Sequence, residues 1–560
     1  MTENKKKHYC IVGLSRLKLL NFSVYIYSVL TRKKIITVEP ILKNVQWANI
    51  EILPFPEDYC GSVMFKIHED VTKFIKNVEM DIKHDNPLII RWLNKIYKTD
   101  KFVVYFFKQF IDIAFFALGE AYAIKKKYPA PVLLFPNAYF FRKIGSQLLN
   151  NTECKYSNLL SLIIIILTLL RIVFELFNTL IIIFNIKNVE KKKGFILREL
   201  VWGRQPNRKM RDDMFVDNKS IKSDDMIYYS HEKLFERGKA YEEARQEGIA
   251  IHEYHKKSIN LNRSFLYLLY YNIIIVPSYV VASIFAMDFF MFIPKILRDG
   301  SKVHIMMSFV EVKFHFSVHD WGDQLETIIF NLYGVQSFLY HWADMTGYIS
   351  VAQQVSCHNI VFHWSRLAST LHIHSSSMVD INKIVGCPFR MFDYEREKIR
   401  SRYRFNPTQS VITFLDNSCG SYSVYSRKDI VEFYRSVKYI DQNLDRDVLI
   451  LIKPKGIANL NRFSDILDFS ERVIILDPVK HSVNDVIKLS DVNIGLGPST
   501  VPTISLINGI PGIYHDFAGT TSNPLSKYEG DLFVRNKEDL LMAIKKYIKF
   551  TGDIREKFPE

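Results

Sequence analysis

Three loops near the C-terminus combine residue types that bind phosphate. Residues 497–500 (GPST) join small residues to two hydroxyls at the start of a predicted helix, where backbone N–H groups and the helix dipole favour an anion. Residues 453–456 (KPKG) follow a predicted strand, so their lysines can meet a diphosphate. Residues 416–421 (DNSCGS) offer amide and hydroxyl groups. The side chains predicted to bind the ligand are Lys453, Lys455, Asn417, Ser418, Gly497, Ser499 and Thr500.

Each loop also has an ordinary structural interpretation. Ser499 is a good helix N-cap, the lysines suit a basic surface turn, and residues 416–421 suit a plain turn. What favours a site is the order of the elements, because all three loops directly follow predicted strands. Ligands of open parallel sheets bind beyond the carboxyl ends of the strands.

His319 and Asp320 are the candidate general base and its orienting carboxylate. They lie in FSVHDWGD, just after a strand-like run, and a carboxylate beside an imidazole can fix its tautomer and raise its basicity. Adjacent side chains of a strand point to opposite faces, which favours the alternative of a core or rim histidine. Weaker candidates are His341, Asp344 and His363. His372 and His374 could share one strand face, but no third ligand accompanies them, and the sequence predicts no metal site.

A repeated unit of strand, loop and helix positions these residues. The last 150 residues predict strands at 411–415, 447–452, 473–476, 492–495, 512–515 and 531–534, with helices at 428–442, 482–489 and 537–550. The N-terminal half shows the same alternation, with predicted strands at 9–14, 34–38, 131–135, 303–310, 336–340 and 359–362 and a long helix at 102–127. This alternation predicts an α/β protein with doubly wound, mostly parallel sheets.

Two apolar segments interrupt the N-terminal half, at 156–186 and 264–297. The first holds two uncharged runs separated by Arg171 and Glu175, which are four residues apart and could pair on a helix. It fits a spanning helix, a re-entrant hairpin or an interfacial helix. Residues 264–287 contain no charge and are long enough to span a bilayer, although a core helix kinked at Pro277 is the alternative. The polar segment 188–263 between them carries lysines at both ends, which predicts that it is cytoplasmic.

Composition limits the function classes. The chain has 560 residues, 48% hydrophobic and 24% charged, with a net charge of +15. That charge suits anionic lipid or phosphorylated small molecules, and no nucleic-acid-binding motif occurs. Six cysteines without CxxC spacing indicate free thiols. The run YCIVGLS near the N-terminus predicts a first strand rather than a signal peptide. P-loop, GxSxG, HExxH and GxGxxG motifs are absent from the sequence.

Residues 447–516 resemble the nucleotide-sugar half of GT-B glycosyltransferases of bacterial surface polysaccharide assembly, of the capsule and O-antigen type. The resemblance is carried by Lys453-Pro454, by 490–495 (SDVNIG), by Ser499-Thr500 and by 509–513 (GIPGI). Residues 385–388 (VGCP) resemble the segment that precedes this domain in the family, and 202–221 resemble a segment of surface carbohydrate biosynthesis proteins. The sequence departs from the pattern at Lys453, where many relatives have histidine.

The resemblance implies two doubly wound lobes, an acceptor lobe at 1–380 and a donor lobe at 389–550. It implies transfer of a sugar from a nucleotide-activated donor to a lipid-linked or membrane-borne glycan, without a cofactor or a bound metal. The enzyme would work at the cytoplasmic face of the plasma membrane, on an anionic surface and without nucleic acid. The alternatives are a CDP-polyol phosphotransferase of the same fold and a non-catalytic component of a glycan assembly complex.

Overall fold

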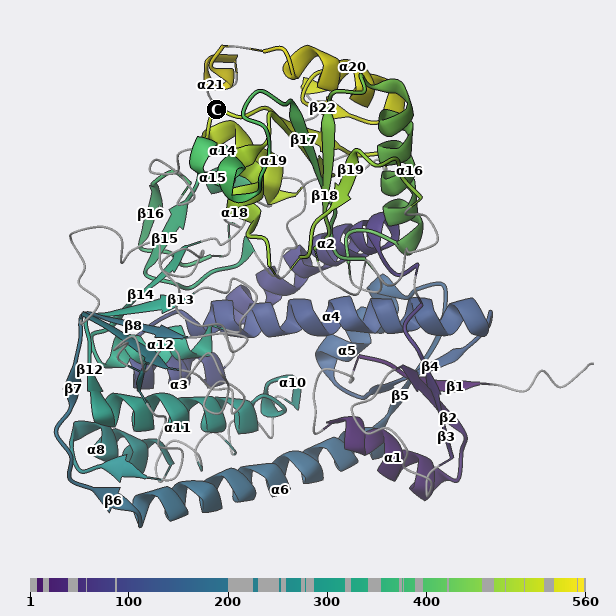
Figure 1. Cartoon of the computed structure of the whole chain (residues 1–560). Helices are drawn as coiled ribbons and strands as arrows, with labels where there is room; N and C mark the ends of the chain where they lie inside the picture. Colours follow the sequence, from purple (N-terminus) through teal and green to yellow (C-terminus); the bar gives the residue numbers. More distant parts are fainter. Residues whose placement is uncertain are drawn as a thin grey trace, which may run out of the picture.

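A computed structural model describes most of the chain. The described residues are 8–13, 20–38, 49–199, 225–229, 251–252, 258–272, 287–317, 324–340, 354–387, 396–455, 468–517 and 528–557, with short gaps inside these ranges. They form three large parallel sheets, which we name the first, second and third sheet, and two small strand pairs. Figure 1 shows the third sheet at one end of the molecule, helix α4 across its middle and helix α6 along the opposite end.

The first sheet has the strand order β3-β2-β1-β4-β5. Its strands are β1 (Tyr9–Ile11), β2 (Ile35–Val38), β3 (Ile50–Leu53), β4 (Val132–Pro136) and β5 (Glu153–Ser157). Its helices are α1 (Leu20–Thr31), α2 (Gly61–Asp85), α3 (Leu88–Tyr97), α4 (Phe102–Lys127), α5 (Tyr139–Lys143) and α6 (Asn158–Ile183). The second and fourth strands are wholly buried, as expected of short apolar strands covered by helices.

The second sheet has the order β10-β9-β8-β13-β14-β15-β16. Its strands are β8 (Ile196–Glu199), β9 (Met226–Tyr229), β10 (Ile251–His252), β13 (Phe314–Ser317), β14 (Gln336–Tyr340), β15 (Ile360–His363) and β16 (Ile381–Ile384). Its helices include α8 (Arg263–Tyr270), α10 (Met287–Phe290), α11 (Ile293–Phe309), α12 (Leu325–Leu332) and α14 (Arg366–Leu371). The small pairs join β6 (Ile186–Lys187) to β11 (Ile259–Asn260) and β7 (Lys192–Lys193) to β12 (Val310–Glu311).

The third sheet has the order β19-β18-β17-β20-β21-β22. Its strands are β17 (Val411–Leu415), β18 (Leu449–Lys453), β19 (Val473–Ile475), β20 (Val492–Leu496), β21 (Gly512–His515) and β22 (Phe533–Val534). Its helices are α15 (Arg396–Arg402), α16 (Arg427–Asn443), α18 (Val483–Leu489), α19 (Thr500–Ile507), α20 (Lys537–Tyr547) and α21 (Ile554–Lys557). Helix α16 begins with a capping box formed by Ser426 and Asp429.

All three sheets are doubly wound. Each begins at an inner strand, continues to one edge and then returns to the other side of the first strand. The direction of winding reverses between β1 and β4, between β8 and β13, and between β17 and β20. The carboxyl ends of such neighbouring strands leave a crevice in which ligands bind.

The structure confirms the predicted α/β class and most predicted elements. Helix 102–127, strands 336–340 and 411–415, and the N-terminal strand have the expected type and nearly the expected bounds. The predicted strand at 303–310 is wrong, because these residues form the end of α11 and only Val310 enters a strand. A short buried apolar run has no periodicity that separates a strand from a core helix. The segment assigned to one acceptor lobe contains two sheets.

The two apolar segments have different outcomes. Residues 158–183 form one continuous helix, α6, in which Arg171 and Glu175 pair as predicted, with 2.5 Å between Nη2 and Oε1. The second segment begins with α8, and most of residues 273–286 lie outside the described residues. The same holds for most of the polar segment 188–263.

The second and third sheets share an apolar cluster. Phe316 and Tyr340 of the second sheet belong to it, together with Ile487 of α18 and Ile504 of α19. Helices α18 and α19 therefore cover one face of the second sheet. Tyr340 also donates a hydrogen bond to the carbonyl of Gly386 in the segment that joins the two sheets, at 2.5 Å between the oxygens. This packing fixes α19, whose first turn belongs to the candidate site, against the second sheet.

Candidate functional site

The predicted ligand-binding loops follow three neighbouring strands. In the third sheet, Leu415 of β17 is paired with Lys453 of β18 on one side and with Gly495 of β20 on the other. The loops that begin at residues 416, 454 and 497 therefore leave the sheet side by side. They lie at its carboxyl edge, and β17 and β20 are the strands between which the winding reverses.

Asp416 joins the first two loops. Its buried carboxylate accepts a hydrogen bond from the Tyr434 hydroxyl at 2.8 Å and another from the backbone N–H of Lys455. The Lys455 ammonium donates to Oδ1 of Asn417 at 2.9 Å. Two residues predicted from different loops, Asn417 and Lys455, are thus in contact. The neighbouring Ser418 turns over Asn417, since its N–H donates to the same Oδ1 at 2.9 Å.

Lys453 lies at the end of β18 and is almost entirely buried. Its ammonium donates to the carbonyl of Pro478 at 3.2 Å. Burial lowers the pKa of Lys453, and the carboxylates of Asp416 and Asp477 act in the opposite direction. An ammonium group withdrawn from water interacts more strongly with an anion than an exposed one does.

Glycine is required at the end of β20 for steric reasons. Gly497 has φ of +50°, and a Cβ built there would lie 1.7 Å from the hydroxyl oxygen of Tyr425. A Cβ on Gly495 would lie 2.4 Å from Oγ of Ser499. These glycines let the chain turn tightly over the edge of the sheet, with the Tyr425 and Ser499 hydroxyls above it. Neither hydroxyl has a hydrogen-bond partner among the residues that the structure describes.

Ser499 occupies the N-cap position of α19 without forming a side-chain capping bond. Its own N–H donates to the carbonyl of Gly497 at 2.7 Å. Thr500 begins the helix. The Ser499 side chain therefore leaves the N–H groups in the first turn of α19 uncapped at the carboxyl edge. Beside them lies the buried Ser499 hydroxyl, which has no partner within the described part of the chain.

The predicted general base is not described. His319 and Asp320 lie outside the described residues, as do His341, Asp344, His372 and His374. The described strand that precedes the first pair is β13, which ends at Ser317 on the carboxyl edge of the second sheet next to β8. His363 is fully buried in β15. Within the described ranges there is no cluster of three or more His, Cys, Asp or Glu side chains able to hold a metal ion.

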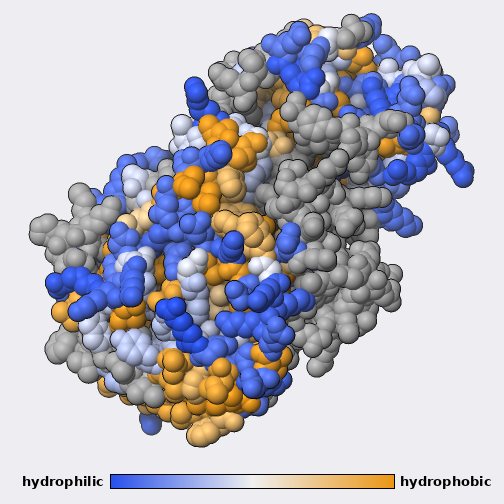
Figure 2. Space-filling view, turned by 90° about the vertical axis from the view of Figure 1, so that its left-hand side faces the viewer, coloured by the Kyte–Doolittle hydropathy of each residue, from blue (hydrophilic) through white to orange (hydrophobic). Residues whose placement is uncertain are grey.

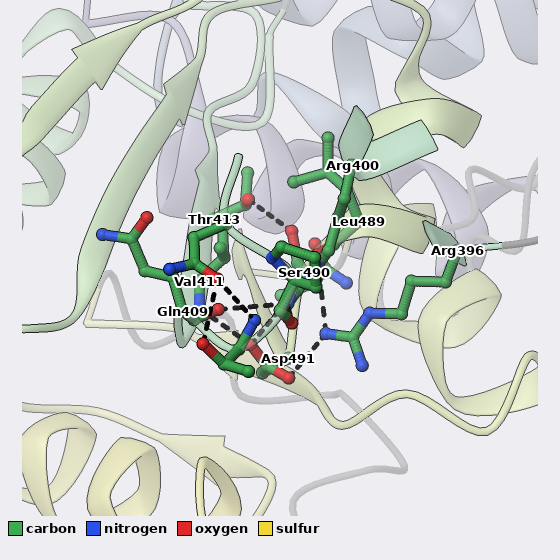
Figure 3. Close-up of polar contacts among 12 residues, drawn as sticks. Arg396, Arg400, Gln409, Val411, Thr413, Leu489, Ser490 and Asp491 are labelled. Carbon is green, nitrogen blue, oxygen red and sulfur yellow. Dashed lines mark hydrogen bonds and ion pairs between the residues drawn. The ribbon is translucent and has the colours of Figure 1, made fainter. Parts of the chain in front are cut away.

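The motif at 490–495 has a structural role at the opposite edge of the sheet (Figure 3). Asp491 accepts hydrogen bonds from the N–H of Val411 at 2.7 Å and from the guanidinium groups of Arg396 and Arg400 at 2.5 and 2.9 Å. Arg400 also donates to the carbonyls of Leu489, Pro407 and Gln409. Thr413 and Ser490 share a hydrogen bond of 2.6 Å. These contacts tie the starts of β17 and β20 together.

No protein-family model matches the chain, and no curated protein matches its sequence. Solved structures do resemble it. The wall teichoic acid polymerase TagF is 10% identical over 66% of this chain and 84% of its own, with a TM-score of 0.37. HepE of Anabaena, in complex with UDP and glucose, is 10% identical over 64% and 90%, with a TM-score of 0.37. A glycosyltransferase from Rickettsia africae is 13% identical over 65% and 92%, with a TM-score of 0.38.

The sequence did not predict the residues that support the three loops of the site, namely Asp416, Tyr425 and Tyr434. Asp416 belongs to a predicted loop but was not predicted to join it to Lys455. Tyr425 and Tyr434 carry hydroxyls at the site, yet in the sequence they resemble ordinary core aromatics. No signal in the sequence sets Tyr425 apart, because its close approach to Gly497 arises only from the folded chain.

Proposed function

We propose that the chain is a glycosyltransferase that binds a nucleotide-activated sugar at the carboxyl edge of the third sheet. One observation carries the proposal, namely the convergence of three strand-end loops at the point where the winding of the sheet reverses. The convergence brings buried Lys453, the Lys455–Asn417 pair and the Ser499 hydroxyl, which has no partner among the residues described, to one edge. This set of cations, hydroxyls and helix N–H groups suits a diphosphate.

Such a site can assist departure of a nucleoside diphosphate. As the bond from the sugar to the diphosphate breaks, negative charge grows on the phosphate oxygens. Lys453, Lys455 and the first turn of α19 would stabilise that charge, so the proposed reaction does not depend on a divalent metal. The proposed base is His319, with Asp320 orienting it, and it would take the proton from the acceptor hydroxyl.

The proposed acceptor is a lipid-linked or membrane-borne surface glycan, which would place the enzyme at the cytoplasmic face of the plasma membrane. The net charge of +15 supports an anionic surface as the place of work. Helix α6, whose outer face is apolar, supports contact with lipid.

A thermal-shift screen of the full chain against UDP, GDP, CDP, CMP and ADP tests the proposal. A ligand that binds the folded state raises the melting temperature by mass action. We expect a rise with one nucleoside diphosphate that is equal with magnesium and with EDTA. A rise with CDP alone would direct the next assay to CDP-polyol donors. No rise with any nucleotide would contradict the proposal and favour a non-catalytic role.

A further inference from the structure

Helix α6 has its polarity reversed relative to a helix at a water-exposed surface. Its serine, both threonines and its glutamate, namely Ser161, Thr168, Thr179 and Glu175, are buried. Asn158 at its start is exposed, and Arg171 is partly exposed. The other exposed side chains are all apolar, and we name them the α6 face: Leu159, Leu162, Ile166, Leu169, Leu170, Val173, Phe174, Phe177, Leu180 and Ile181, with Phe184 just beyond the helix. A surface helix in water shows the opposite arrangement, with polar residues outside.

Among the long apolar helices of the described residues, α6 alone shows the reversal. The shorter helix α1, which packs against α6, shows a smaller version of it, with Ser23 and Ser28 buried and Phe22, Val29 and Leu30 exposed. Two described helices are long and apolar enough to cross a membrane by length and composition, α4 and α6. Helix α4 is mostly buried inside the protein, as a core helix is, whereas more than half of α6 is not. Figure 2 shows hydrophobic side chains gathered at the bottom of the molecule, the end at which Figure 1 draws α6 and α8.

Packing holds α6 along the side of the protein. Ile163, Ile164 and Leu167 belong to the core that contains the first sheet. Near the other end of the helix, Ile182 packs with Leu268 of α8 and Ile305 of α11. Helix α6 therefore rests on the protein at both ends, and crossing a bilayer would require both contacts to break. The α6 face can meet lipid only with the helix lying in the plane of the surface.

Cations follow the C-terminal end of the α6 face along the chain and begin the neighbouring helix α8. Lys187, Lys191, Lys192, Lys193 and Arg263 lie in the segments next to it, against two acidic residues, Glu190 and Glu311. Leu261, Leu266 and Tyr270 in and beside α8 extend the exposed apolar surface. An apolar strip bordered by lysine and arginine matches the boundary between acyl chains and anionic headgroups.

We propose that the α6 face docks on an anionic lipid bilayer, with α6 lying in the membrane plane and not crossing it. The proposal does not depend on the chemistry at the third sheet. A second copy of the chain is the competing occupant of an apolar face, but the cationic border would then be repeated on both subunits and repel itself. A lipid surface of opposite charge removes that repulsion.

Flotation with vesicles tests the docking. The full chain is mixed with phosphatidylcholine vesicles that either contain or lack phosphatidylglycerol. We expect binding that is stronger with phosphatidylglycerol and weakened about tenfold or more by Val173→Asp together with Phe177→Asp, since each removes a large apolar contact. Met542→Asp is the matched control, because Met542 is an exposed apolar residue of α20 on the third-sheet end. Equal binding by the α6 variant and the control would overturn the proposal.

Tryptophan quenching tests the orientation of α6 relative to the membrane. It uses tryptophan variants, so it remains informative even when the aspartate variant does not fold. Leu162→Trp, Val173→Trp and Phe184→Trp place a reporter at the start, middle and end of the α6 face, over roughly 33 Å of helix. Lipids brominated at known depths quench each reporter, and the signal of the wild-type tryptophans is subtracted. We expect similar, shallow depths at all three positions. A middle position much deeper than both ends would show a spanning helix and overturn the proposal.

Light scattering without vesicles measures the mass of the protein and so tests whether a second copy of the chain covers the α6 face. We expect the wild type and the Val173→Asp/Phe177→Asp variant to have the same mass in a mild detergent. A wild-type dimer that becomes a monomer in the variant would assign the α6 face to a second copy of the chain and overturn the lipid assignment.

Discussion

The tight turn after β20 depends on two particular residues, Gly497 and Tyr425. Gly497 adopts a left-handed conformation and leaves no room for a side chain beneath the Tyr425 hydroxyl. This turn sets the direction of the Ser499 hydroxyl and of the first N–H groups of α19. The geometry of the candidate site therefore rests on a steric fit between a glycine and a tyrosine.

Gly497→Ala should disrupt this turn. The added methyl group meets the Tyr425 ring and the backbone is strained, so we expect a loss of about 3 kcal/mol in the free energy of unfolding and loss of nucleotide binding. Adding Tyr425→Phe removes the closest atom, at 1.7 Å, but leaves ring carbons at 2.7 and 3.1 Å. Urea unfolding should therefore show partial rescue in the double variant. An unchanged Gly497→Ala protein would refute the steric argument.

Lys453 and Ser499 should contribute to donor binding separately from stability. Lys453→Met keeps the packing of the aliphatic stem but removes the charge, and we expect about tenfold weaker nucleotide binding. Ser499→Ala removes one neutral hydrogen bond, and we expect about fivefold weaker binding. Calorimetry measures both, with Lys438→Met on α16 as the matched lysine control. Unchanged affinity in both variants would remove these residues from the site.

At the scale of elements, side-chain contacts hold the third sheet together at the amino ends of its strands, opposite the candidate site. Arg400 is buried and makes four hydrogen bonds there, one of them to Asp491. Removing one partner of such a pair leaves a buried charge without compensation, which costs more than the pair itself contributes. The SDV part of the motif thus fixes β17 and β20 rather than contacting a ligand.

Asp491→Ala should therefore destabilise the protein without a direct effect on the site. We expect a loss of about 3 kcal/mol in the free energy of unfolding, measured by urea denaturation at a temperature where the variant is still folded. Nucleotide affinity of the folded fraction should be within about twofold of the wild type. Arg402→Ala, which breaks an exposed pair with Asp485, is the control and should have little effect. A specific loss of affinity in Asp491→Ala would instead place this aspartate at the site.

Elements were predictable from sequence where periodicity and flanking residues agree. Residues 102–127 have both helical periodicity and a lysine-rich end, and α4 has the predicted bounds. Strands of the third sheet are short apolar runs between turn residues, and they too match. The strand predicted at 303–310 was wrong because a buried helix and a buried strand share the same apolar composition. The order of strands, which brings the three loops together, follows from long-range pairing that no local pattern encodes.

At the scale of the whole molecule, buried histidines link stability to pH. His304 in α11 and His515 in β21 are almost completely buried, and burial lowers their pKa to about 3 and about 4. Burial also lowers the pKa of His68 in α2 to about 4. The unfolded chain binds a proton at each near pH 6.5, whereas the folded chain does not. Stability is therefore fully present above that pH and decreases as the pH falls, by about 1.4 kcal/mol per pH unit for each histidine.

The melting temperature should accordingly fall between pH 6.5 and pH 4. His515→Gln cannot take up a proton in this range, so its melting temperature should fall less steeply than that of the wild type. His481→Gln, for which no comparable burial exists, should keep the wild-type slope. Identical slopes in all three proteins would show that the histidine at 515 does not govern acid sensitivity.

Hydrogen exchange of the full chain, with and without the nucleoside diphosphate found in the screen, tests the central claim most directly. Bound diphosphate should slow exchange of the backbone amides at 416–419, 453–455 and 497–502, because these follow the three neighbouring strands at the reversal point of the third sheet. Amides near Asp491, at the opposite edge, should be unaffected. Protection elsewhere, with no change in these three loops, would contradict the account.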